Sequence, residues 1–372
     1  MTDIAPGLLP EGLRDRLPPE AEAAATLLRR VIDVTAAHGY ERVQPPLAEF
    51  EANLVGRLKS ARAQDLLRFV DPVSQRTLAL RPDITAQVGR IASTRMAKRA
   101  RPLRLAYGGQ VLKVRGTQLR PEREMAQAGA ELIGLDSVEA AIEMISVAIE
   151  ALTAMGASDI SIDLTLPDLV EALAQGPMKL SSDKIRDVQH SLDGKDAAAL
   201  HMLGADAYQP LIAAAGPLHS AVERLRGLPG QAVLGPRLDG IERIAAGIGG
   251  RATITLDPTE RHGFEYQSWI GFSLFVAGAR GEVGRGGSYT VVHGDGGEEP
   301  AVGFSLYLDP LIDIGLGREG RNRIFLPLGT AAETGQKLRA EGWATVAALT
   351  MNCDAQRLGC SHVWTGQEAL KV

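Results

Sequence analysis

Apolar side chains recur at helical spacing near the start of the chain. Between Glu20 and His38 they occupy positions 24, 27, 28, 31, 32 and 34, and Gly39 follows. This pattern predicts an amphipathic helix that ends before the glycine. The next stretch, Tyr40–Phe50, contains Pro45-Pro46. Because proline cannot donate a hydrogen bond within a sheet, we expect an extended segment at a sheet edge or an interface.

Two stretches have the pattern of β-hairpins. The first runs from Leu66 to Leu80 around the turn residues DPVS, and the second spans Pro102–Gly134. Asp83 is expected to cap a helix that reaches about Ser93. Asp136 and Glu139 form a capping-box-like start for a longer helix that ends at Gly156.

The rest of the chain alternates between strand-rich and helix-rich parts. Residues 158–166 alternate as a strand, 167–250 have helical periodicity, and 253–308 are strand-rich with a hairpin around 294–297. Since hairpins outnumber crossovers, the pattern favours an α+β fold with a mainly antiparallel sheet flanked by helices.

The same pattern predicts a division of the chain into parts. We expect a core over residues 1–313 with a helical insertion at about 167–250. A linker rich in glycine and arginine covers 314–322, and a small α/β domain covers 323–372. Gly315, Gly317 and Gly320 satisfy G-x-G-x-x-G, but the strand-like RIFLPL follows them. A dinucleotide site needs a helix there, so we expect no such cofactor.

Composition narrows the classes of function. The 372 residues are 45% hydrophobic, enough for a large core, and the net charge of −5 argues against a role dominated by nucleic acid. We therefore expect the basic run Arg95–Arg104 to be a solvated helix end and not a nucleic-acid site. Two cysteines, Cys353 and Cys360, and seven scattered histidines give no metal-site spacing. No leader pattern or membrane span is evident, so we expect a cytoplasmic protein without a membrane partner.

Four local patterns, in order, carry a resemblance. They are LALRPDITAQ at 78–87, the segment YGGQ to ELIG at 107–134, HGFEYQ at 262–267 and PAVGFSLYLDPLI at 300–312. Over roughly residues 5–313 the chain resembles the catalytic core of class II histidyl-tRNA synthetases, and GRGGSY at 284–289 is similar to that family's Gly-Gly-Arg-Tyr-Asp turn. The resemblance implies a class II fold and a dimer formed through the proline-bearing strand.

Three positions depart from the synthetase pattern. Where the family has arginines that contact ATP or the activated amino acid, this chain has Lys113, His262 and Pro310. Lysine lacks the planar fork of arginine, neutral histidine lacks its charge, and proline lacks both. Since one lost transition-state donor typically costs about 10² to 10³ in rate, we expect no catalytic residues and no catalysis.

The amino-acid pocket is retained in outline. By the resemblance, Asp83, Thr85 and Gln127 stand where the synthetases hold the α-amino group of histidine. Glu131 matches the acid that faces the imidazole, and Tyr266 matches the first residue of a tyrosine pair. The second tyrosine of that pair, also an imidazole contact, is replaced by Gln267.

An inactive synthetase relative with this pocket is similar to the ATP phosphoribosyltransferase regulatory subunits. That resemblance implies a non-catalytic subunit needed for activity of a short-form catalytic phosphoribosyltransferase, in the first step of histidine biosynthesis. It also implies feedback inhibition by histidine as effector, and no tRNA partner. Two alternatives stay open at this point: an active or divergent histidine-tRNA ligase, and a stand-alone amino-acid sensor that acts on another enzyme.

Overall fold

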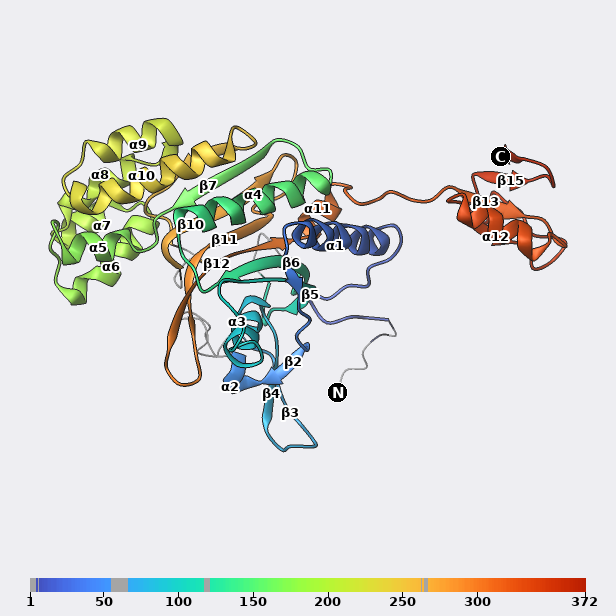
Figure 1. Ribbon diagram of the computed structural model, residues 1–372, viewed down its shortest axis with the longest axis horizontal. Coiled ribbons are helices and arrows are strands. Elements are labelled where there is room, and N and C mark those ends of the chain that lie inside the picture. Colours follow the sequence, from blue (N-terminus) through green and yellow to red (C-terminus); the bar gives the residue numbers. More distant parts are fainter. Residues whose placement is uncertain (1–4, 6, 55–65, 117–120, 262, 264–266) are drawn as a thin grey trace. The chain divides into compact units, whose positions relative to one another are not determined.

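The computed structural model describes residues 5, 7–54, 66–116, 121–261, 263 and 267–372 (Figure 1). The chain divides into two compact units, Met1–Gly317 and Arg318–Val372. Each unit has its own sheet and its own hydrophobic core.

A nine-stranded sheet organises the first unit. Its order is β1-β5-β6-β12-β11-β10-β7-β9-β8, and all neighbours are antiparallel except β1 with β5 and β7 with β9. The strands are β1 (Glu41–Arg42), β5 (Leu103–Leu112), β6 (Glu124–Ile133), β7 (Ile160–Thr165), β8 (Gly216–Pro217), β9 (Thr253–Leu256), β10 (Gln267–Val276), β11 (Gly284–Val292) and β12 (Glu298–Tyr307). The mainly antiparallel α+β architecture is therefore as the sequence predicts.

Two long helices, α1 (Glu20–Ala37) and α4 (Val138–Ala154), cover one face of this sheet (Figure 1). The predicted helical stripe of α1 buries Leu27 and Val31 against it. Helix α4 is apolar on nearly every side because it lies between the sheet, α1 and α10 (Gln231–Ile248). The principal hydrophobic core lies along this face.

The opposite face of the sheet carries α3 (Thr85–Thr94). Ile84 and Val88 pack here against a second core cluster that includes Tyr107 and Tyr289. Next to α3 lie a small three-stranded sheet of order β2-β4-β3 and a short helix. These elements are β2 (Ala48–Phe50), α2 (Glu51–Leu54), β3 (Arg68–Val70) and β4 (Thr77–Leu80). The start of α3 thus lies over the middle of the large sheet, which positions the candidate site.

A group of helices follows β7 and packs as a separate layer beside α10 (Figure 1). They are α5 (Leu169–Gln175), α6 (Ser182–Asp193), α7 (Ala197–Met202), η2 (Asp206–Tyr208), α8 (Gln209–Ala213) and α9 (Leu218–Arg226). Helix α11 (Asp309–Asp313) follows β12 directly.

The second unit is a four-stranded sheet with order β14-β13-β15-β16 and one helix. Its elements are β13 (Arg323–Leu326), α12 (Ala332–Ala340), β14 (Ala344–Ala347), β15 (His362–Trp364) and β16 (Ala369–Lys371). A strand, β13, follows Gly315, Gly317 and Gly320, which agrees with the rejection of a dinucleotide motif there.

Three local predictions are wrong. The N-cap residue of α3 is Ile84, because the Asp83 carboxylate lies one position earlier and accepts from the Thr85 amide at 2.7 Å. Helix α4 is capped by Ser137, which accepts from the Ala140 amide, and Asp136 instead accepts from the Trp269 indole at 2.9 Å. The segment Gly284–Tyr289 is not a turn but part of strand β11.

Within the described residues, no helix is long and apolar enough to span a membrane.

Candidate functional site

The centre of the candidate site is Glu131 on β6, whose side chain is fully buried. Its Oε1 accepts from the Tyr107 hydroxyl at 3.0 Å, and its Oε2 accepts from the Tyr289 hydroxyl at 2.8 Å. Burial raises the pKa of Glu131 to about 8, the Asp83 charge adds to this, and the tyrosine hydrogen bonds partly oppose it. A ligand that donates or shares a proton with this carboxyl group would therefore stabilise it.

Glycine on the intervening strand makes this geometry possible. Gly303 of β12 pairs with Glu131 on one side and with Gly287 on the other. A Cβ atom on residue 303 would lie 1.5 Å from Glu131 Oε2. Only a residue without a side chain lets the carboxyl group extend across β12 to Tyr289 on β11.

Asp83, Thr85 and Gln127 lie beside Glu131 in one hydrogen-bond network. Gln127 Nε2 donates to Asp83 Oδ2 at 2.6 Å and to Ser305 Oγ at 2.7 Å. The hydroxyl of Tyr107 lies 2.8 Å from Ser305 Oγ and 3.1 Å from Thr85 Oγ1. The four predicted pocket residues that the structure describes are thus brought together, and Tyr107 and Ser305 connect them.

A buried arginine fixes the segment that carries Asp83. Arg81 donates to the backbone oxygens of Gln110 at 2.7 Å and of Pro45 at 3.0 Å. Burial lowers its pKa, while the charges of Asp83 and Glu49 oppose that effect. Since the guanidinium still carries its charge at neutral pH, it holds the loop before α3 against β5.

Gln267 and Arg285 complete the described wall of the pocket. Gln267 opens β10 and donates its Nε2 hydrogen to the Gly286 oxygen at 2.8 Å. The Arg285 side chain on β11 pairs with Glu282 and lies against Gly263, where a Cβ atom would meet its Nη1. The pocket thus contains a positive group that the motif analysis did not single out.

The space enclosed by these residues is small. The cavity measures about 10 Å³ and is lined by Thr85, Glu131, Gln267, Arg285, Gly286, Gly287, Tyr289, Gly303, Phe304 and Ser305. That volume is about the space of one water molecule. An amino-acid side chain can therefore enter only if side chains around the cavity move apart.

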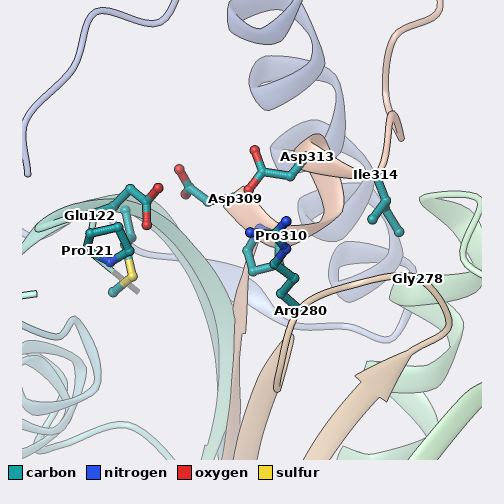
Figure 2. A pocket seen from close by; sticks show the side chains of 9 residues that line it. Pro121, Glu122, Gly278, Arg280, Asp309, Pro310, Asp313 and Ile314 are labelled. Atoms are coloured by element: carbon teal, nitrogen blue, oxygen red, sulfur yellow. The ribbon is translucent and has the colours of Figure 1, made fainter. Parts of the chain in front are cut away.

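The position that replaces the third synthetase arginine lies at a different cavity. Pro310 at the start of α11 lines a space of about 450 Å³ together with Arg280 (Figure 2). Three carboxylates, those of Glu122, Asp309 and Asp313, line it as well. Arg14 lies within 4.0 Å of all three carboxylates and Arg16 pairs with Asp309, so these acids and arginines are ion-paired within the protein.

The other predicted positions are Lys113, His262 and Tyr266. Lys113 is exposed just after β5, with its Nζ 6.0 Å from the centre of the Tyr307 ring. It does not line the cavity around Glu131. His262 and Tyr266 lie outside the described residues. In the part of the chain with assigned positions, no cluster of three or more histidine, cysteine or acidic residues could hold a metal ion.

Sequence reasoning did not identify Tyr107, Tyr289, Ser305 or Arg285 as pocket residues. A signal exists for Ser305, since it is a polar residue inside the apolar strand AVGFSLY. Tyr289 lies in the GRGGSY motif, but its contact with Glu131 depends on the order of three strands and has no local signal.

Comparison with known proteins places this geometry in a family. A family model described as histidyl-tRNA synthetase matches residues 12–311. A protein of Rhodospirillum centenum named ATP phosphoribosyltransferase regulatory subunit is 45% identical over 380 residues, with 98% of this chain and 97% of the relative covered. A protein of the same name from Rhodospirillum rubrum is 43% identical over 371 residues, covering 96% of this chain and 95% of the relative.

Solved structures show the same fold. A crystal structure described as an ATP phosphoribosyltransferase regulatory subunit/histidyl-tRNA synthetase from Bacillus halodurans has a TM-score of 0.81 at 23% identity, covering 96% of this chain and 97% of that one. Histidyl-tRNA synthetase from Nostoc has a TM-score of 0.79 at 17% identity, covering 96% of this chain and 90% of that one. The chain therefore has the class II synthetase fold and belongs to the family of ATP phosphoribosyltransferase regulatory subunits.

Proposed function

We propose that this chain is the non-catalytic regulatory subunit of an ATP phosphoribosyltransferase, and that histidine binds in the pocket around Glu131. The single observation that carries the proposal is the contrast between two sites. The pocket for an amino acid keeps its buried carboxyl group and its hydrogen-bond network. The place where ATP would be activated has a proline and three carboxylates instead of arginine.

The proposed contacts follow from the chemistry of histidine. Asp83, Thr85 and Gln127 offer oxygen atoms for the α-amino group. Glu131 faces the imidazole, and Tyr266 is proposed beside it. The Arg285 guanidinium lines the same cavity and also pairs with Glu282, and we propose that it binds the carboxylate of the ligand. Each polar end of a zwitterion thus has a partner of suitable charge.

Absence of catalysis is part of the proposal. A triphosphate near Pro310 would meet the carboxylates of Glu122, Asp309 and Asp313. Asp309 Oδ2 also accepts from the Ala126 amide at 2.8 Å, and the arginines at 14 and 16 contact the same aspartate. Those two arginines are therefore ion-paired with a protein carboxylate in the folded chain.

The small cavity suggests how binding could regulate. A ligand that needs a wider pocket binds better to a conformation in which the pocket is open. If the catalytic partner binds the two conformations unequally, histidine changes the activity of the assembly, and by reciprocity the partner changes the affinity for histidine.

We also propose that the chain self-associates along the edge that carries β1 and the two prolines. A cavity of about 620 Å³ lies there, lined by residues of α1, β5 and the segment 12–16. Sedimentation of the isolated chain checks this, since a dimer of this chain has twice the 39.5 kDa mass.

The test is reconstitution with a short-form catalytic subunit from the same organism. Formation of phosphoribosyl-ATP from ATP and phosphoribosyl pyrophosphate is measured with and without this chain. The proposal predicts that the chain increases the rate and that histidine lowers the increased rate. An unchanged rate with two folded proteins would refute the regulatory role and favour an amino-acid sensor for another enzyme. Histidine-dependent exchange of pyrophosphate into ATP would instead favour an active ligase.

A further inference from the structure

The side chain of Gln267 carries a buried acceptor that no described residue satisfies. It is 8% exposed, its Nε2 donates to the Gly286 oxygen, and its Oε1 is fully buried without a hydrogen-bond partner among the described residues. A buried polar atom without a partner costs free energy, so its position needs an explanation.

The backbone around Gln267 aims this oxygen into the pocket. The pairing of β10 with β11 shifts between Gln267 and Gly271, and such an irregularity redirects a side chain. Oε1 lies over Gly287, where a Cβ atom would be 2.3 Å away. Gly287 has a φ of +148°, a conformation that favours glycine.

Gln267 and Glu131 face each other across neighbouring strands. Gly287, under Gln267 Oε1, pairs directly with Gly303, under Glu131 Oε2. Both side chains line the same small cavity. Since Nε2 donates to the Gly286 oxygen, Oε1 is the atom of this amide that lacks a partner among the described residues, and an amide oxygen can only accept a hydrogen bond.

We propose that Gln267 determines specificity by accepting a hydrogen bond from a ring N–H of the ligand while Glu131 binds the other ring nitrogen. This inference rests on the proposed histidine site and adds which ring chemistry the site requires. A five-membered ring with two nitrogens, at least one of them bearing hydrogen, satisfies both groups. A ring of the same shape without an N–H leaves Gln267 Oε1 unpaired, and such sites reject the deficient ligand strongly.

Calorimetric titration with three ligands of similar shape tests this. Histidine and 1,2,4-triazolylalanine carry a ring N–H, whereas thiazolylalanine has none. Each is titrated into the full chain, its Gln267→Met variant, and a Gln189→Met control. Gln189 is also a buried glutamine, but it lies on α6 and bonds to Glu171.

In the unmodified chain we expect thiazolylalanine to bind about 100-fold more weakly than histidine, and triazolylalanine within about 10-fold of it. Gln267→Met is expected to lower the affinity for histidine by about 10- to 100-fold. In this variant the affinity for thiazolylalanine should lie within about threefold of the affinity for histidine. The Gln189→Met control should keep the ratio of histidine affinity to thiazolylalanine affinity that the unmodified chain has.

Two results would overturn the inference. One is equal affinity of the unmodified chain for histidine and thiazolylalanine, a comparison that does not depend on any variant folding. The other is an unchanged ratio of the two affinities in Gln267→Met. If the folded chain binds no histidine at all, the proposed histidine site fails first and this inference fails with it.

Discussion

Tyr289 on β11 donates its hydroxyl hydrogen to Oε2 of Glu131 on β6 at 2.8 Å, although β12 lies between the two strands. The contact passes over Gly303, and it joins the middle of the sheet to the strand that also carries Arg285. A ligand that moves Glu131 must therefore affect both β6 and β11. An effector that binds at the Glu131–Tyr289 pair can thus act on two strands at once.

Replacement of Gly303 by alanine should disturb the pocket directly. The added Cβ would lie 1.5 Å from Glu131 Oε2, so the carboxyl group must move and its bond from Tyr289 is lost. We expect the free energy of unfolding to fall by about 1–3 kcal/mol and histidine binding to be lost. Urea denaturation and calorimetry measure the two effects.

Gly227→Ala is the matched control. This glycine ends α9 with helical backbone dihedrals, and the nearest atom to the position of an added Cβ is the Arg224 oxygen at 3.4 Å, an ordinary van der Waals contact. Alanine favours a helix over glycine by about 0.5–1 kcal/mol, so this variant should be unchanged or slightly more stable. Equal stability and equal histidine affinity in Gly303→Ala and the unmodified chain would contradict the described packing.

The stability of the chain should depend on pH through Glu131. Burial raises its pKa to about 8 in the folded chain, whereas an exposed glutamate has a pKa near 4.5. Between these values the folded state holds a proton that the unfolded state has lost. The free energy of unfolding therefore falls as pH rises, by up to about 1.4 kcal/mol per pH unit, and the effect levels off above pH 8.

The Glu131→Gln variant isolates this effect because glutamine does not titrate. We expect its advantage in unfolding free energy over the unmodified chain to grow between pH 5 and pH 8. Other buried acids, such as Asp136, contribute equally to both proteins. Parallel stability curves for the two proteins over this range would exclude a strongly raised pKa at Glu131.

Arg285 should matter for the carboxylate of the ligand and not for its ring. Histamine has the imidazole and amino groups of histidine but no carboxylate. We expect Arg285→Met to weaken histidine binding at least about 10-fold while leaving histamine binding within about threefold, since only the carboxylate loses a charged partner. Equal losses for both ligands would indicate that Arg285 serves the structure of the pocket instead.

Restoring two of the three missing arginines should not restore catalysis. In a Lys113→Arg, Pro310→Arg double variant, Glu122, Asp309 and Asp313 still surround the position of the new guanidinium at residue 310. We expect no histidine-dependent exchange of pyrophosphate into ATP above background, because the carboxylates that already pair with Arg14 and Arg16 are expected to pair with the new guanidinium as well. Measurable exchange would show that the carboxylates are not a barrier.

The sequence predicts the fold well where a local pattern sets the structure. The apolar stripe of Glu20–His38 became α1, and the alternation of residues 102–134 became the β5–β6 hairpin. The cap of α3 was missed by one position, since Asp83 accepts from the Thr85 amide from just before the N-cap, and the cap of α4 was missed because Asp136 bonds to the distant Trp269. Such long-range hydrogen bonds leave no local signal in the sequence.

The candidate site was predictable only in part. Motif order placed Asp83, Thr85, Gln127 and Glu131 on one surface, and the structure brings these four together. The roles of Tyr289, Gly303 and Gln267 follow from strand order and register, which the sequence alone does not determine.

The most direct test measures how strongly histidine inhibits the phosphoribosyltransferase that this chain has stimulated. The measurement compares the unmodified chain, the Glu131→Gln variant and an Asp136→Asn control. Asp136 is a partly buried carboxylate bonded to Trp269 and does not line the pocket. The account predicts that all three chains stimulate the catalytic subunit, and that only Glu131→Gln loses sensitivity to histidine, by at least about 10-fold. Full histidine inhibition with Glu131→Gln would contradict the assignment of the regulatory site to this pocket.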